Sequence, residues 1–144
     1  MLTLGVVACS ILAFDQVTKH LVLHYLAPSG PVVIIPNVFR LNFVQNTGIA
    51  FGLFQGHPEF WTWIITSSVL LLLALSPLFA RRSFVQKTAY GFILGGALGN
   101  WIDRLRYQHV VDFLDVYVWP VFNVADSFIT IGVLMFAWLM VREH

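Results

Sequence analysis

Charged residues are scarce in this chain of 144 residues, because Asp, Glu, Lys and Arg together make up only 10% of it. An ordinary globular protein carries roughly 25% charged residues. Hydrophobic residues make up 58% of the chain. So few charges cannot cover the surface of a water-soluble fold, and the composition instead suits a protein that is solvated by lipid.

Cysteine is almost absent, and so are the patterns of a metal site. Cys9 is the only cysteine, which excludes an internal disulfide framework, and no Cys/His cluster has zinc spacing. His20 and His24 lie four residues apart but lack the adjacent carboxylate of an HExxH site. We therefore expect no metal site here. The net charge of +1, without a basic stripe, gives no support to nucleic-acid binding.

Four segments are long and apolar enough to cross a bilayer as helices, which takes about 20 residues each. They cover about residues 2–26, 60–80, 88–105 and 123–141. The apolar stretch before Cys9 has no basic residues ahead of it and continues past that cysteine. We therefore expect a retained helix there rather than a signal peptide. The third segment is rich in glycine, and small residues let membrane helices approach closely.

Residues 31–54 do not have the pattern of a helix. Phe39, Leu41 and Phe43 alternate with other residues at the period of a half-buried strand, and residues 32–35 could form its partner. We therefore predict a membrane α-helical fold in a single domain covering residues 1–144. It would have four transmembrane helices and a small extracytoplasmic β-sheet between the first two.

Basic residues in short loops predict the orientation. Arg81, Arg82 and Lys87 cluster between the second and third predicted helices, which favours a cytoplasmic position for that loop. With four spans, both termini would then be cytoplasmic as well. Arg104 and Arg106 fall on the outer side and count against this orientation.

Aspartates are concentrated in one part of the chain: four of the five lie between Asp103 and Asp126. Carboxylates in or near a membrane are costly and usually mark function. If the loop after Asp112 folds back, Asp112 and Asp126 would meet near the outer membrane surface. Two carboxylates that share a site hold one proton between them, because both cannot easily ionise. The ionised one can activate water while the neutral one polarises a carbonyl, as in aspartic proteases.

Several of these residues have plain structural interpretations as well. Asn123 could be a helix N-cap, with Asp126 at the third helical position. Asp15 and Lys19, four residues apart, could form an ordinary intrahelical ion pair. For Asp103 we favour a structural role at a helix end.

Asp115 is a further candidate acid by spacing alone. It lies three residues from Asp112, so on a helix the two would share a face.

Five sequence elements together resemble one family, the lipoprotein signal peptidases, also called signal peptidase II. Residues 15–19 (Asp-Gln-Val-Thr-Lys) resemble its first-helix motif, and residues 46–52 (Asn-Thr-Gly-Ile-Ala-Phe-Gly) its Asn-x-Gly-x-Ala-Phe element. Residues 95–104 match its Gly-Gly-Ala-x-Gly-Asn-x-x-Asp-Arg element. Residues 110–113 and 122–126 match its two catalytic boxes. The elements appear in the family's order and cover nearly the whole chain.

The resemblance implies a role for each matched residue. Asp112 and Asp126 match the catalytic dyad. The positions that line the substrate pocket or hold the dyad are matched by Asn46, Gly48, Asn100, Arg104 and Asn123. Asp15, Lys19 and Asp103 match motif positions with a structural or substrate-supporting role.

The resemblance also implies an activity and a cellular location. The family cleaves bacterial prolipoproteins just before a cysteine that carries diacylglycerol, in the bacterial cytoplasmic (inner) membrane, and needs no metal or cofactor. It is blocked by globomycin-type cyclic peptides, and its outward sheet forms a periplasmic cradle.

Two other functions are compatible with parts of the sequence. A small proton-coupled transporter would also carry membrane aspartates, but here the acids gather near one interface and no inverted repeat is visible. A structural subunit that assembles through the glycine-rich helix would leave the aspartate cluster unexplained.

Overall fold

The computed structural model describes residues 1–48, 58–79 and 81–142. The first helix, α1 (Leu2–Leu21), continues through a π-helical turn (Val22–Leu26) into the short α2 (Ala27–Ser29). The remaining long helices are α3 (Pro58–Leu75), which ends in a 3₁₀ turn (Ser76–Phe79), α4 (Phe84–Tyr107) and α5 (Val124–Arg142). All four predicted helices are therefore present, although α4 begins earlier than expected.

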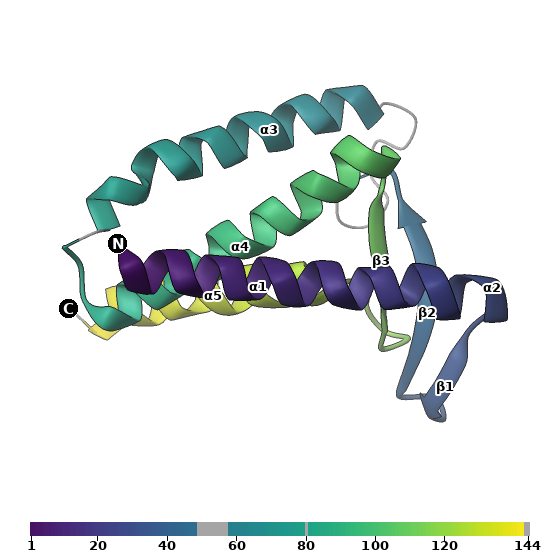
Figure 1. Cartoon of the computed structure of the whole chain (residues 1–144). Coiled ribbons are helices and arrows are strands. Elements are labelled where there is room, and N and C mark those ends of the chain that lie inside the picture. The colour runs from purple at the N-terminus through teal and green to yellow at the C-terminus, as the bar shows by residue number, and fades with distance from the viewer. Residues whose placement is uncertain (49–57, 80, 143–144) are drawn as a thin grey trace.

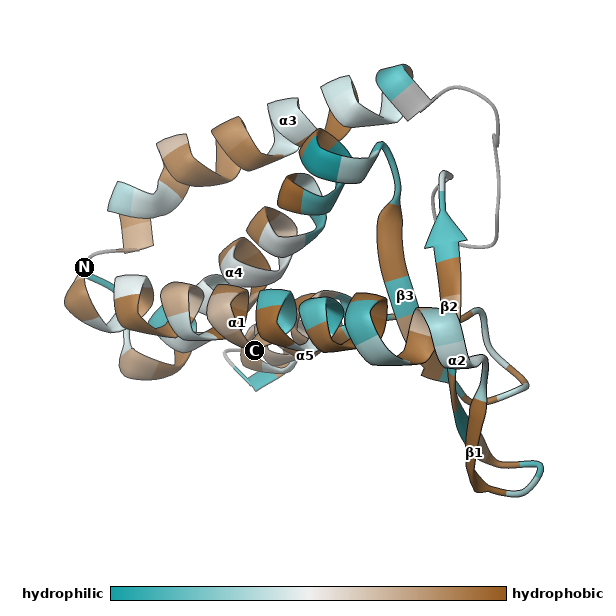
Figure 2. Cartoon of the chain, turned by 45° about the vertical axis from the view of Figure 1, so that its right-hand side comes forward, coloured by the Kyte–Doolittle hydropathy of each residue, from teal (hydrophilic) through white to brown (hydrophobic). Residues whose placement is uncertain are grey.

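Three of the described helical segments are long and apolar enough to cross a membrane: Leu2–Ser29, Glu59–Phe79 and Val124–Arg142. Figure 2 shows hydrophobic colouring along much of α3, whereas hydrophilic residues gather on the end of α1 nearest the sheet. Helix α4 is not among the three segments, although its 24 residues would extend about 36 Å at 1.5 Å per residue. Its glycines and its polar C-terminal end make it the least apolar of the long helices.

Helix α4 is the centre of the helical bundle, since it packs against α1, α3 and α5. Both chain termini lie at one end of the bundle, and the sheet lies at the other end (Figure 1). The bundle therefore has a polar, sheet-bearing end that is well separated from its termini.

Glycine allows α4 to approach its neighbours closely. A Cβ atom added at Gly95 would lie 2.6 Å from the backbone oxygen of Ala8 in α1, and one at Gly96 would lie 2.5 Å from that of Ala125 in α5. No real side chain tolerates such contacts. The predicted packing role of these glycines is confirmed, and it brings the polar residues of α1, α4 and α5 together.

The sheet has three antiparallel strands in the order β1-β2-β3: β1 (Val32–Ile35), β2 (Phe39–Asn46) and β3 (Val110–Asp115). The sequence predicted the first two strands, while residues 49–54 of the predicted β region lie outside the described residues. It missed β3, and the helical arrangement considered for Asp112 and Asp115 is wrong. Residues at an odd spacing in a strand point to opposite faces, so these two aspartates do not share a surface.

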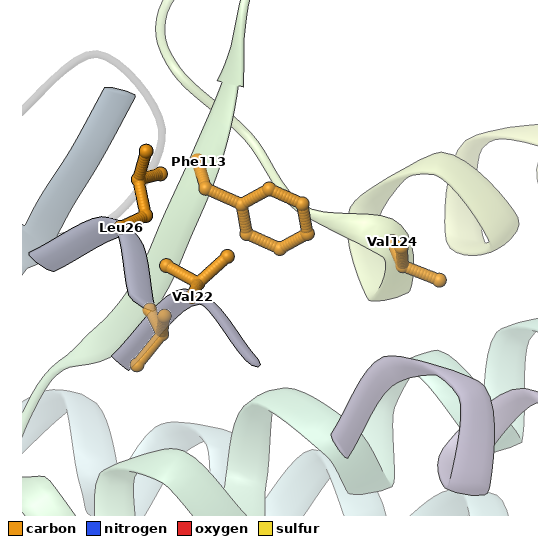
Figure 3. Packing of buried hydrophobic residues seen from close by; sticks show 5 residues of the cluster. Val22, Leu26, Phe113 and Val124 are labelled. Atoms are coloured by element: carbon orange, nitrogen blue, oxygen red, sulfur yellow. The ribbon is translucent and has the colours of Figure 1, made fainter. Parts of the chain in front are cut away.

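A small apolar core attaches the sheet to the helices. It joins Val22 and Leu26 at the end of the first helix to Phe113 in β3 and Val124 at the start of α5. Figure 3 shows the Phe113 ring lying between Val22 and Val124. This contact fixes β3 against the first turn of α5, which are the two elements that carry Asp112 and Asp126.

Candidate active site

Asp112 is held in β3 by two side-chain amides. Its side chain is buried, with 1% of the residue exposed. Oδ2 accepts a hydrogen bond from Asn46 Nδ2 over 2.9 Å, and Oδ1 accepts one from Asn123 Nδ2 over 2.7 Å. Asn46 ends β2 and Asn123 precedes α5, so three separate elements fix the orientation of this carboxyl group.

Asp126 lies in the first turn of α5 and forms a reciprocal cap with Asn123. The backbone N–H of Asp126 donates to Asn123 Oδ1 over 2.9 Å, and the backbone N–H of Asn123 donates to Asp126 Oδ2 over 3.3 Å. The capping interpretation of these residues is thus correct. The other oxygen of Asp126, Oδ1, accepts a hydrogen bond from Asn100 Nδ2 over 2.7 Å. One carboxylate oxygen thus takes part in the cap while the other contacts a residue of the site.

The environment of Asp112 favours its protonated form. Burial first, and then the negative charge of Asp126, raise the pKa of Asp112 from 3.8 to about 7, against hydrogen bonds from Asn46 and Asn123. A carboxyl with this pKa can hold or release a proton near neutral pH. The two carboxylates therefore form an electrostatically coupled pair that can act as acid and base.

An ion cluster of Asp15, Lys19 and Asp103 lies next to this pair and is connected to it through Asn100. The Lys19 ammonium group contacts Asp15 Oδ2 at 2.9 Å and Asp103 Oδ2 at 2.8 Å, and it donates to Asn100 Oδ1 over 2.9 Å. Asp15, Lys19 and Asp103 are each at most 2% exposed. The predicted ion pair between Asp15 and Lys19 is present, but it belongs to a larger network that reaches the dyad.

The two carboxylates of the cluster also anchor backbone groups. Asp15 Oδ1 accepts the backbone N–H of Ala125 over 2.9 Å, and Asp103 Oδ2 accepts that of Val111 over 3.1 Å. Ala125 precedes Asp126, and Val111 precedes Asp112. The residue directly before each acid of the pair therefore donates its backbone N–H to the ion cluster.

Arg104 faces the site with part of its guanidinium group unpartnered. Its Nη2 donates to the backbone oxygen of Gly48 over 2.7 Å. Nε and Nη1 are buried and have no hydrogen-bond partner among the described residues. Buried donors are normally satisfied, so these two groups suit a bound ligand that carries oxygen acceptors.

Asp115 is engaged away from this site. Its carboxylate accepts hydrogen bonds from Arg40 Nε over 2.7 Å, from Asn42 Nδ2 over 3.2 Å and from the backbone N–H of Tyr117 over 2.9 Å. Although desolvation opposes them, these donors hold the pKa of Asp115 below its usual value. Asp115 therefore belongs to the structure of the sheet.

Among the described residues, no group of three or more histidines, cysteines or acids could hold a metal ion.

Comparisons with known proteins identify the family of the chain. A family model described as Signal peptidase (SPase) II matches residues 7–142. The lipoprotein signal peptidase of Halothermothrix orenii is 40% identical over 136 residues, which cover 92% of this chain and 93% of the relative. That of Shouchella clausii is 43% identical over 132 residues, covering 91% and 87%.

The chain belongs to the signal peptidase II family. Its structure is similar to a solved bacterial membrane enzyme with a TM-score of 0.87 and 29% sequence identity, over 99% of this chain and 90% of that one. A second such structure gives a TM-score of 0.84 at the same identity, over 100% and 96%. The family is one of peptidases, and the transporter alternative receives no support.

Within this signal peptidase II fold, sequence reasoning missed one residue of the network. Gln16 Nε2 donates to Asp103 Oδ1 over 3.0 Å and to the backbone oxygen of Gly99 over 3.3 Å. Its position beside Asp15 in the first-helix motif was the only signal in the sequence. The network thus joins α1 to α4 through an uncharged residue as well as through ions.

Proposed function

We propose that this protein removes signal peptides from bacterial prolipoproteins by aspartic endopeptidase chemistry, cutting just before a diacylglyceryl-modified cysteine. Asp112 and Asp126 would be the catalytic dyad. The observation that carries this proposal is the coupled pair, in which Asp112 is buried and Asp126 half-buried: Asn123 hydrogen-bonds both carboxylates, and the charge of Asp126 raises the pKa of Asp112. Membership of the signal peptidase II family supports it independently.

The dyad would work by dividing one proton between two acids. The ionised carboxylate takes a proton from water as the water oxygen attacks the scissile carbonyl carbon. The neutral carboxyl donates to the carbonyl oxygen, which stabilises the tetrahedral intermediate. The intermediate then collapses, the C–N bond breaks, and the leaving amine takes up a proton from the dyad. The chain's own carboxyl groups perform every step, so the reaction needs no metal or cofactor.

The surrounding residues would bind the substrate and hold the acids in place. The Nε and Nη1 donors of Arg104, which have no partner in the described part of the chain, suit carbonyl oxygens of an extended substrate backbone. The hydrogen bond from Arg104 to the Gly48 carbonyl fixes that guanidinium. Asn46, Asn100 and Asn123 would keep the carboxylates oriented between turnovers.

The proposed membrane arrangement rests on the positions of the basic loop and of the dyad at opposite ends of the bundle. We propose a single integral membrane domain of residues 1–144 in which α4 is a fourth span, screened by its neighbours, with a cytoplasmic loop at Arg81 and Arg82. That loop separates α3 from α4 at the end of the bundle where both termini lie (Figure 1). The sheet and the dyad would then face the outer side of the inner membrane, where a lipidated precursor can reach them.

A cleavage assay on two matched substrates tests the proposed function. The protein, purified in detergent, receives a prolipoprotein with a diacylglyceryl-modified cysteine or the same precursor with an unmodified cysteine. We expect cleavage before the modified cysteine only, and inhibition by a globomycin-type cyclic peptide. Equal cleavage of both precursors would contradict the substrate assignment, and cleavage of neither would contradict the function.

A further inference from the structure

The ion cluster beneath the dyad has a definite direction of hydrogen-bond donation. A lysine ammonium group has three N–H donors and no acceptor. In Lys19 all three have partners: Asp15 at 2.9 Å, Asp103 at 2.8 Å and Asn100 Oδ1 at 2.9 Å. Because Lys19 can only donate, the atom of Asn100 that faces it must be the amide oxygen.

This constraint settles the orientation of Asn100. The two ends of an asparagine amide are nearly identical in shape, so their assignment rests on the hydrogen-bond network. With Oδ1 directed at Lys19, Nδ2 is directed at Asp126 Oδ1, 2.7 Å away. In the opposite orientation the amide would place an N–H group against the ammonium and its oxygen against a carboxylate, both repulsive in a buried site.

Asn123 contacts the same Asn100 oxygen, while its own orientation is set by the backbone N–H of Asp126, which donates to Asn123 Oδ1 over 2.9 Å. Asn123 Nδ2 donates to Asn100 Oδ1 over 3.0 Å, and so completes the acceptor capacity of that oxygen. Its second N–H donates to Asp112 Oδ1 over 2.7 Å. Asp126 therefore receives an amide N–H whose direction depends on Lys19, and Asp112 receives one from Asn123, which the same Asn100 oxygen holds in place.

We propose that Lys19 is a positioning residue for catalysis: its ammonium group sets the direction of the Asn100 amide, so that Asp126 receives an N–H donor and Asn123 receives an acceptor that aligns its own amide with Asp112. This inference rests on the proposed function. Without the ammonium group, the Asn100 amide would lose the charged donor that keeps its oxygen directed away from Asp126. Lys19 does not touch the substrate; it acts through the two asparagines.

A charge-conserving variant separates this role from simple charge balance. The cluster of Asp15, Lys19 and Asp103 carries a net charge of −1, and Lys19→Met combined with Asp103→Asn keeps that value. Wild type is the reference for charge, because its cluster carries the same net charge as the double variant. The single variant Asp103→Asn, which retains the ammonium group, shows the effect of losing Asp103 alone. Relative to both, the double variant should lose kcat roughly 10- to 100-fold, as loss of a supporting hydrogen-bond partner does, with little change in KM.

The pH profile adds a readout that a purely structural role would not move. The positive charge of Lys19 lowers the pKa of Asp112. Loss of that charge should therefore shift the alkaline limb of the kcat profile to higher pH. An unchanged kcat and an unchanged limb in a folded double variant would overturn the proposal. Failure to recover folded double variant, when Asp103→Asn folds, would overturn it too, because Lys19 would then serve the fold.

Chemical rescue distinguishes a donor from a charge. A cavity of about 310 Å³ borders Lys19, Gln16 and Asp103 and also reaches Arg106 and Tyr107. In Lys19→Ala, a small primary ammonium ion such as propylammonium could enter through this cavity and replace the lost N–H groups. We expect propylammonium to raise the kcat of Lys19→Ala at least tenfold. Tetramethylammonium, which has charge but no N–H, should leave it unchanged.

The outcomes of the rescue are decisive in both directions. Equal rescue by the two cations, or by neither, would overturn the positioning role. Wild type and Asp103→Asn are assayed in parallel on the lipid-modified precursor. If wild type itself does not cleave, the proposed function fails, and that result is distinct from loss of activity confined to the Lys19 variants.

Discussion

The side chain of Asn123 donates a 2.7 Å hydrogen bond to Asp112, while its backbone N–H and side-chain oxygen cap the helix turn that carries Asp126. One residue thus combines a helix cap with the coupling of two carboxylates. The structural and catalytic interpretations of this segment are therefore not alternatives. The cap positions Asp126, and the side-chain amide of Asn123, whose N–H groups the cap does not use, donates to Asp112.

Asn123→Ser should separate these two roles. Serine caps helices about as well as asparagine, but its hydroxyl is too short to replace the amide bridge to Asp112. We expect kcat to fall roughly 100-fold, within the range for misplaced acid–base groups. Asn123→Ala should lose the cap as well and be less stable by about 1 kcal/mol. Thermal unfolding in detergent, measured beside cleavage, checks both effects, and a fully active Asn123→Ser would contradict the bridge.

The pH dependence of cleavage should have an alkaline limit near neutrality. Catalysis by the dyad requires one proton on the pair, and the pKa of Asp112 is raised to about 7. Above that pH both carboxylates ionise and kcat should decline about tenfold per pH unit. A kcat profile on the lipid-modified precursor between pH 5 and pH 10 checks this, with Asp115→Asn as a control for general effects of charge. A flat profile across this range would contradict the coupled pair.

Stability should show the same titration with a defined sign. Because the folded state raises the pKa of Asp112 above 3.8, it binds the proton more tightly than the unfolded chain does. The contribution of Asp112 is most favourable below pH 3.8 and is lost as the pH rises toward 7. The loss is on the order of 4 kcal/mol, at about 1.36 kcal/mol per pKa unit. The stability of Asp112→Asn relative to wild type should therefore be greater at pH 8 than at pH 5. An equal difference between the two proteins at both pH values would be inconsistent with the raised pKa.

Close helix packing at Gly96 should be sensitive to a single methyl group. A Cβ atom there would lie 2.5 Å from the Ala125 backbone oxygen and 2.7 Å from Ile129 Cγ1. We expect Gly96→Ala to cost about 1–3 kcal/mol, as overpacking does. Gly5→Ala is the matched control, because nothing lies within 4 Å of a Cβ at Gly5, and alanine should be neutral or slightly stabilising in that helix. Similar melting temperatures for the two variants would disprove the tight contact.

Local patterns in the sequence were sufficient to predict the helices and the first two strands. Apolar runs gave the helices, and the alternation of Phe39, Leu41 and Phe43 gave β2. The ion pair between Asp15 and Lys19 followed from their spacing alone. Each of these features depends on residues that are close in the chain.

The third strand and the network under the dyad could not be obtained in this way. The run that forms β3 is short and carries Asp112 and Asp115 at an odd spacing, and the residues of β2 that pair with it lie about 70 residues earlier. The contact of Lys19 with Asn100 spans 81 residues, and glycine-mediated packing of α1 on α4 brings them together. Only the family resemblance pointed to Asn46 and Asn100 from the sequence, and it gave no partners for them.

The most direct test of the account compares Asp112→Asn and Asp126→Asn with Asp115→Asn in cleavage of a diacylglyceryl-modified prolipoprotein. Asparagine keeps the size and polarity of aspartate but cannot cycle a proton. Asp115 sits in the same sheet but is bound to Arg40 and Asn42, so its replacement controls for loss of a nearby carboxylate. We predict folded, inactive protein for the first two variants and near wild-type kcat for the third; cleavage by either dyad variant at the wild-type rate would contradict the account.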